Sequence, residues 1–373
     1  MIPVSFQQRG LWFINQLEGP SPMYNIPVAV RLSGPLDQDA LRAALADLVI
    51  RHETQRTLFR DDDGVPYQHI IDPADARVWL DTVPVTEADL PAAVLAAGRH
   101  AFDLAAEMPF RAWLFVLGPA EHVLVILLHH IVFDGWSTGP LIRDLTQSFT
   151  ARRDGGAPDW QALQVQYADY TIWQRDLPGD EIDPDSVASR QLAYWRQTLA
   201  GIPEELWLPA DRPRPETSSY RGDTVPVEIG PGTYQALKAL VRESNAALYM
   251  ALQAGLAVLL TRLGAGEDIP IGVPLAGRND DALTDLIGFF ITTTVVRVDT
   301  SGNPGFRDLL APAMSANPGA YEHQDLPFER IVELLNPVRL SSRNPLFQTM
   351  GSETRAEPSI VSRQFANTSH SKE

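Results

Sequence analysis

Residues 122–135 read HVLVILLHHIVFDG, an apolar run that ends in two histidines and is followed by an Asp-Gly pair. The run is short and rich in β-branched residues, which predicts a buried β-strand over about residues 122–131. Ser137 then stands where it can cap a helix, and the inward stripe of that helix would be Leu141, Ile142, Leu145 and Phe149. This order of elements places Asp134 and Gly135 in a turn at the end of a buried strand, where functional groups are commonly exposed.

The same order of strand, turn and helix is predicted on both sides of this stretch. Residues 25–32 show partial alternation and lead to a helix that Asp37 caps. Residues 224–229 are a further predicted strand, which a Gly-Pro-Gly turn connects to another helix. Strands that alternate with helices in both halves predict an α/β layered fold with two subdomains.

The length of 373 residues is natural for two domains. We expect an N-terminal lobe at 1–175 that carries the histidine pair, and an acidic, proline-marked linker or crossover at 176–222. The C-terminal lobe is expected at 223–350, followed by a polar, aperiodic and mobile tail at 351–373. The atypical tail leaves open that the second lobe is truncated.

Composition excludes several classes of protein. The chain has 30 basic and 47 acidic residues, a net charge of −17 that would repel a phosphate backbone, so no nucleic acid partner is expected. It has no cysteine, which excludes disulfides, thiolate metal sites and a cysteine nucleophile. No apolar run reaches the length of a membrane span, and the first residues do not resemble a secretory signal. We therefore expect a cytoplasmic protein that does not bind membranes, and we also expect it to be monomeric.

Three interpretations compete for His129 and His130. Metal binding is disfavoured, because adjacent residues of a strand point to opposite faces, so no metal site is predicted. The second interpretation is that both residues are core histidines with a purely structural role, whose hydrogen bonds are satisfied within the protein. The third is positioning or acid–base catalysis by one imidazole, with the other buried as its support. A nucleophilic triad through Ser137 is disfavoured, since the chain has no Gly-x-Ser-x-Gly elbow.

The His-His-x-x-x-Asp-Gly pattern at residues 129–135 resembles that of the condensation domains of nonribosomal peptide synthetases and of the wider chloramphenicol-acetyltransferase-like superfamily. Further blocks that resemble those of condensation domains occur in the family's order from residue 3 to about 350. They are Ser5–Phe13 with Tyr24–Pro27, Arg51–Glu53 with Arg56–Phe59, Tyr167–Tyr170 with Trp173, Ile271–Arg278 with Ile287–Phe290, His323–Glu329, and Ser342–Gln348. Together these blocks are far more specific than the histidine pattern alone.

This resemblance implies two acetyltransferase-like subdomains in a V-shaped pseudo-dimer with a central tunnel. It implies that His130 is catalytic, that His129 and Gly135 support the active site, and that Asp134 forms a structural salt bridge with Arg278 of the second lobe. The candidate tunnel or substrate residues are Tyr24, Trp136, Ser137, Thr292, Ser342 and Asn344.

The reaction that the resemblance implies is amide formation, as in the biosynthesis of peptide antibiotics. A donor acyl or peptidyl thioester would react with the amine of an acceptor aminoacyl thioester. Both would be carried on the phosphopantetheine arms of donor and acceptor carrier proteins, beside an adenylation domain, and the domain itself would bind no cofactor. Two alternatives stay open: a non-catalytic domain that recruits partner enzymes, and an acyltransferase that uses coenzyme A thioesters.

Overall fold

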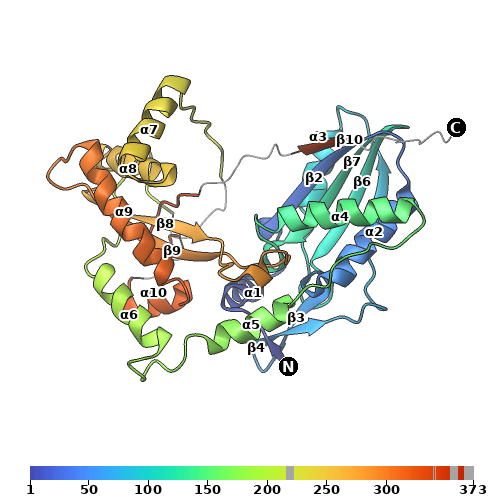
Figure 1. The fold of residues 1–373 in the computed structure, drawn as a ribbon, viewed down its shortest axis with the longest axis horizontal. Helices are drawn as coiled ribbons and strands as arrows, with labels where there is room; N and C mark the ends of the chain where they lie inside the picture. Colours follow the sequence, from blue (N-terminus) through green and yellow to red (C-terminus); the bar gives the residue numbers. More distant parts are fainter. Residues whose placement is uncertain (216–221, 339, 341, 353–359, 365–373) are drawn as a thin grey trace. The chain divides into compact units, whose positions relative to one another are not determined.

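The computed structural model describes residues 1–215, 222–338, 340, 342–352 and 360–364, which form two compact units (Figure 1). The first unit contains Met1–Asp176, Arg278–Phe290 and the strand β10 (Ile360–Gln364). The second contains Leu177–Gly277 and the described residues from Ile291 onward. The predicted C-terminal lobe of residues 223–350 is corrected here, because its residues 278–290 fold with the first unit.

The first unit is a mixed α/β structure. Its other strands are β1 (Ile2–Pro3), β2 (Asn25–Ser33), β3 (Thr57–Asp62), β4 (Val65–Ile70), β5 (Leu80–Pro84), β6 (Phe110–Gly118) and β7 (Glu121–His129). Its helices are α1 (Phe6–Glu18), α2 (Gln38–Arg51), α3 (Leu90–Gly98), α4 (Thr138–Arg153) and α5 (Tyr167–Asp176). The main sheet has the order β10-β2-β7-β6-β5, and a smaller sheet has the order β1-β4-β3.

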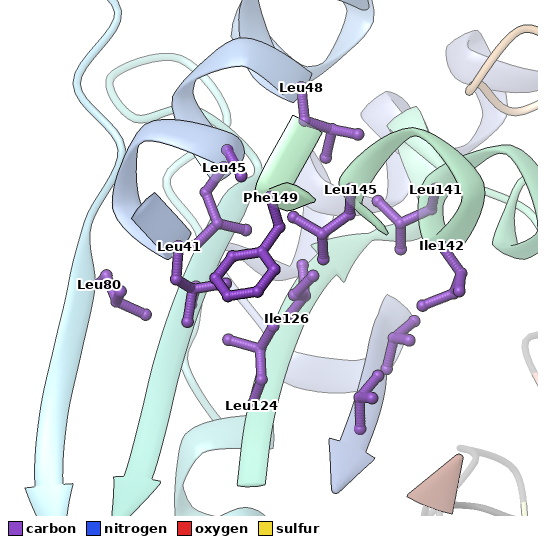
Figure 2. Packing of buried hydrophobic residues seen from close by; sticks show 14 of the residues in the cluster. Leu41, Leu45, Leu48, Leu80, Leu124, Ile126, Leu141, Ile142, Leu145 and Phe149 are labelled. Carbon is purple, nitrogen blue, oxygen red and sulfur yellow. The ribbon is translucent and has the colours of Figure 1, made fainter. Parts of the chain in front are cut away.

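Strand β7 is the centre of the main sheet, and it is antiparallel to both of its neighbours, β2 and β6. Its side chains alternate between two cores, as the period of a strand requires. Leu124, Ile126 and Leu128 pack in one cluster, and Val123 and Val125 pack in another on the opposite face. Figure 2 shows how helices α2 and α4 cover the first face, with Leu41, Leu45, Leu141, Leu145 and Phe149 directed at β7.

The starts of two helices follow from short-range capping. Helix α2 begins as predicted after Asp37, whose Oδ1 accepts a hydrogen bond from the Ala40 N–H at 2.9 Å. Helix α1 begins with a buried capping box: Ser5 Oγ accepts from the Gln8 N–H at 3.1 Å, and Gln8 Oε1 accepts from the Ser5 N–H at 3.0 Å. Reciprocal bonds of this kind satisfy backbone donors that a helix otherwise leaves unpaired.

The second unit is also mixed α/β. Its elements are α6 (Val187–Thr198), α7 (Pro231–Glu243), α8 (Leu248–Arg262), β8 (Asp268–Leu275), β9 (Thr292–Asp299), α9 (Phe306–Glu322) and α10 (Phe328–Leu335). Strands β8 and β9 pair antiparallel, and Ile269, Ile271, Val296 and Val298 from these strands lie in the core of this unit.

In two of its less regular parts the chain differs from the sequence prediction. The expected linker at 176–222 contains helix α6, because Leu192, Trp195 and Leu199 recur at helical spacing and are buried in the second core. Residues 224–229 form no strand, and Val225 and Val227 are 82% and 85% exposed.

Part of the predicted mobile tail, residues 360–364, is strand β10, which pairs parallel with Ala29–Ser33 of β2. It satisfies backbone groups on the edge of β2 that would otherwise lack strand partners. The rest of the predicted tail, apart from Gly351 and Ser352, lies outside the described residues.

Within the described residues, no single helix is long and apolar enough to cross a membrane, and α7 and α8 meet that test only as a pair bent by 112°.

Candidate active site around His130

His129 is the last residue of β7 and is 2% exposed. Its Nδ1 accepts a hydrogen bond from the Ile131 N–H at 3.1 Å, so the proton of the neutral ring is on Nε2. Burial, followed by the neighbouring His130, lowers the pKa of His129 to about 4. His129 is therefore neutral and buried at physiological pH, and its role as a support of the active site stays a prediction.

His130 opens the 3₁₀ turn His130–Val132 and is half-buried. The strand ends two residues earlier than predicted, so the two histidines differ in exposure because the chain turns between them. The Nδ1 atom of His130 is buried and has no hydrogen-bond partner among the described residues. The ring lies against the phenyl ring of Phe289, with 4.6 Å between the two centroids.

Asp134 is fully buried, and its carboxylate accepts hydrogen bonds both from the turn and from the segment Arg278–Phe290. Its Oδ1 accepts hydrogen bonds from the Ser137 N–H at 2.9 Å, the Ser137 hydroxyl at 2.8 Å and Arg278 Nη2 at 3.2 Å. Its Oδ2 accepts from the Phe290 N–H at 3.0 Å. Every polar atom of this side chain is thus used inside the protein.

Arg278 forms the ion pair with Asp134 inside the first unit, which corrects the expectation that it comes from the second lobe. Its side chain is 2% exposed and stacks over the ring of Phe290, with 3.9 Å from Cζ to the centroid. It also donates to the carbonyls of Leu283 and Leu286 at 2.6 and 3.1 Å. Burial lowers the pKa of Arg278, and the Asp134 carboxylate acts in the opposite direction.

Ser137 stands at the N-cap position of α4, but its side chain makes no cap hydrogen bond, contrary to the sequence prediction. It is fully buried, and its hydroxyl accepts from the Gly288 N–H at 3.1 Å and from Arg278 Nη2 at 2.9 Å. Its bond to Asp134 uses the hydroxyl proton that a substrate would need. Ser137 is therefore part of the buried hydrogen-bond network, which corrects its candidacy as a substrate contact.

A comparison with known families fits this arrangement, because the family model of the condensation domain matches residues 1–358. This chain belongs to the condensation domain family of nonribosomal peptide synthetases. A probable non-canonical nonribosomal peptide synthetase of Salinispora arenicola is 55% identical over 350 residues, which are 94% of this chain and 4% of that protein. A dimodular nonribosomal peptide synthase of Bacillus subtilis is 56% identical over 349 residues, 94% of this chain and 15% of that protein. The chain thus spans a small part of the curated relatives that it matches.

Solved structures confirm the mixed α/β fold of condensation domains. The X-domain from teicoplanin biosynthesis superposes with a TM-score of 0.87 at 40% identity, and the match covers 94% of this chain and 76% of that one. The first condensation domain of the CDA synthetase superposes with a TM-score of 0.73 and covers 89% and 79% of the two chains. At 21% identity, this second match supports the fold alone.

The remaining predicted site residues of this condensation domain fall into two groups. Gly135 and Trp136 lie exposed in the turn of the first unit, with Trp136 53% exposed, and Tyr24 is half-buried with its ring 6.2 Å from that of His129. No described protein atom lies within 4 Å of the place that a Cβ would take at Gly135. The other group, which lies in the second unit, is Thr292, Ser342 and Asn344.

The residues of that second group take part in local structure. Thr292 is the first residue of β9 and is buried. Asn344 Oδ1 accepts from the Leu346 N–H at 3.1 Å, and the Ser342 carbonyl accepts from Arg214 at 3.1 Å. Their role in binding substrate stays a prediction.

Tyr167 and Gln8 were not predicted as site residues, although both belong to sequence blocks of the family. The Tyr167 hydroxyl donates to the Phe289 carbonyl at 2.5 Å, and burial raises its pKa well above the usual value, which keeps it a donor. Gln8 Nε2 donates to the Ile131 carbonyl at 3.1 Å. No local pattern marks these contacts, since they join residues more than a hundred positions apart.

A second network, in which His52 and Asp144 are buried, connects α4 to the end of α2. The Asp144 carboxylate meets Arg51 Nε and His52 Nε2 at 2.9 Å each, and Arg143 Nε at 2.8 Å. Burial by itself would raise the pKa of Asp144, but the hydrogen bonds from His52 and Arg143 hold it at about 2. The network is structural, because these side chains bond one another.

Among the described residues, no group of three or more histidine, aspartate or glutamate side chains is placed to hold a metal ion.

Proposed function

We propose that this condensation domain forms an amide bond between a donor acyl or peptidyl thioester and the amine of an acceptor aminoacyl thioester. Donor and acceptor carrier proteins, in the neighbourhood of an adenylation domain, would present both substrates on phosphopantetheine arms. The proposal includes the tunnel and the V-shaped pair of lobes that the family resemblance implies. It also includes a monomeric, cytoplasmic setting, and it requires no cofactor bound by the domain.

The observation that carries the proposal is the contrast between His129 and His130. His129 is neutral and 2% exposed, and its Nδ1 is already occupied by the Ile131 N–H. His130 is half-buried, and because its Nδ1 is enclosed, Nε2 is the ring nitrogen that a substrate could meet. The pair thus provides one support and one imidazole that is available for chemistry.

The chemistry requires a proton acceptor only after the amine attacks. An α-amino group titrates near 8, so roughly a tenth or more of it is neutral at pH 7 without help. Its lone pair forms the C–N bond, the thioester C–S bond breaks, and the nitrogen gives up one proton. We propose that His130 holds the amine in line, accepts this proton and passes it to the departing sulfur. General-base help is worth about 10²–10⁴-fold, and alignment of tethered reactants contributes as much or more.

Reconstitution with two loaded carrier proteins tests the proposal, with mass spectrometry of the amide product as the measurement. We expect His130→Ala to lower the rate by about 10²–10⁴-fold. His69→Ala is the matched control, because His69 lies exposed on β4. Full amide formation by His130→Ala would refute the catalytic role of His130.

Recruitment of a partner enzyme is a second candidate function. The observation that favours it is the similarity to the teicoplanin X-domain, which is also described in a complex with OxyB. Wild-type protein that forms no amide from two loaded carriers would favour recruitment. Amide formation from coenzyme A thioesters without carriers would instead favour the second alternative, an acyltransferase that uses coenzyme A thioesters.

A further inference from the structure

Phe289 differs from its neighbours in the segment Arg278–Phe290 in its exposure and in its contact with His130. Its neighbours Gly288 and Phe290 are buried, whereas Phe289 is half-buried and its ring meets the imidazole of His130 at a tilt of 59°. Phe289 also packs against the apolar cluster that contains Trp12 and Ile131. Phe289 is therefore the residue of this segment whose ring reaches the half-exposed histidine.

The backbone that carries Phe289 is held at three consecutive residues. The Gly288 N–H donates to Ser137 Oγ at 3.1 Å, and the Phe289 carbonyl accepts from the Tyr167 hydroxyl at 2.5 Å. The Phe290 N–H donates to Asp134 Oδ2 at 3.0 Å. All of these partners are buried, so the backbone that carries the Phe289 ring is held by hydrogen bonds that water does not compete for.

His130 has no comparable polar anchor on its enclosed side. The Nδ1 atom of His129 accepts from a backbone N–H, which fixes that ring, but Nδ1 of His130 has no partner among the described residues. The orientation of a ring without such a bond depends on what packs against it. Within the part of the chain that the structure describes, the aromatic ring packed against His130 is that of Phe289.

We infer that Phe289 is a positioning residue, which fixes the imidazole of His130 in the orientation that the reaction uses. The buried Asp134, Ser137 and Tyr167 act on His130 through the backbone of this segment. For its kinetic consequence the inference rests on the proposed amide-forming function. Its structural part, the control of the His130 ring by Phe289, stands independently of that function.

The structural part is tested by NMR of the full chain with ¹³C-labelled histidine. The chain has 8 histidines, and loss of one signal in His130→Ala identifies the Cε1–H resonance of His130. We expect Phe289→Ala to shift this resonance, because removal of an adjacent aromatic ring changes the local magnetic field, while the His129 signal stays in place. Phe13→Ala is the matched control, since Phe13 is 61% exposed on α1. An unchanged His130 signal in Phe289→Ala would overturn the inference.

The kinetic part is tested by amide formation from two loaded carriers. A misplacement of about 1 Å can cost about 10²-fold in rate, so we expect Phe289→Ala to lower kcat by between about ten- and a hundredfold, with KM for both carriers unchanged. Phe289→Tyr keeps the ring and should restore kcat. If Phe289→Ala does not fold, Phe289→Leu replaces it, because it keeps apolar bulk but lacks the ring.

The two measurements separate failure of the inference from failure of the proposed function. A shifted His130 resonance with unchanged kcat would overturn the positioning role, and so would a loss of kcat that Phe289→Tyr does not restore. If the wild type forms no amide, the proposed function fails, and the NMR comparison still tests the ring contact between Phe289 and His130 on which the inference rests.

Discussion

Asp134 and Phe290 are 156 residues apart in the chain and are joined by a buried hydrogen bond of 3.0 Å from the Phe290 N–H to Asp134 Oδ2. The other oxygen of the same carboxylate meets Arg278 at 3.2 Å. Arg278 and Phe290 are the two ends of the segment that folds with the first unit. One aspartate of the turn therefore holds both ends of the segment that brings Phe289 to His130.

Asp134→Ala should destabilise the fold by roughly 3–5 kcal/mol, because it leaves the buried Arg278 guanidinium without its charge partner. Urea unfolding, followed by circular dichroism, measures this change. Glu243→Ala is the control, since its pair with Arg307 is 61% exposed on both sides and should contribute no more than about 1 kcal/mol. Unchanged solubility and an unchanged unfolding midpoint in Asp134→Ala would show that the structural assignment is wrong.

Gly288→Ala tests how closely the segment packs on α5. A Cβ at this position would lie 2.3 Å from Tyr167 Cδ2 and 2.7 Å from Phe290 Cε2, so the aromatic rings would have to move. Overpacking of this kind typically costs about 1–3 kcal/mol, and we expect a matching fall in the free energy of unfolding. Gly139→Ala in α4 meets no atom within 4 Å and should leave stability equal or slightly higher. Equal effects of the two substitutions would contradict the close packing.

Stability should fall as the pH is lowered from about 6.5 to 4, in part because of His129. Burial, followed by His130, lowers the pKa of His129 to about 4 from the ordinary 6.5. Between these values the unfolded chain binds the proton and the folded chain does not, so this stabilising contribution is complete above 6.5 and is lost as the pH falls through this window. A shift of this size corresponds to roughly 3 kcal/mol.

Chemical denaturation at pH 7.5 and 4.5 measures this dependence. His129→Asn keeps a hydrogen-bond acceptor for the Ile131 N–H but cannot titrate, so the loss of stability between the two pH values should be smaller in the variant. Burial also lowers the pKa of His52, which stays in both proteins and cancels in the comparison. An equal loss of stability in the variant and the wild type would show that protonation of His129 does not cause the fall in stability between these pH values.

Much of the first unit can be predicted from residues close together in sequence. The apolar run before His129 predicts β7, Asp37 predicts the start of α2, and the spacing of Leu141 to Phe149 predicts α4. Each signal is local, since strand alternation, caps and helical stripes involve residues at most a few positions apart. Two other segments differ from the prediction. The acidic and proline residues near 176–186 indicate a linker and hide the helical spacing of α6 that follows them. The alternation at 224–229 does not produce a strand, because none of the described strands pairs with these residues.

The sequence by itself determined the family, through the histidine pattern and the order of its blocks, and it indicated that one histidine is buried and the other available. Only the tertiary structure decided that Ser137 bonds Gly288, that Arg278 belongs to the first unit, and that Phe289 faces His130. The physical reason is distance along the chain. A strand or cap is specified by neighbouring residues, whereas these contacts form only when the complete fold brings segments more than a hundred residues apart into one buried site.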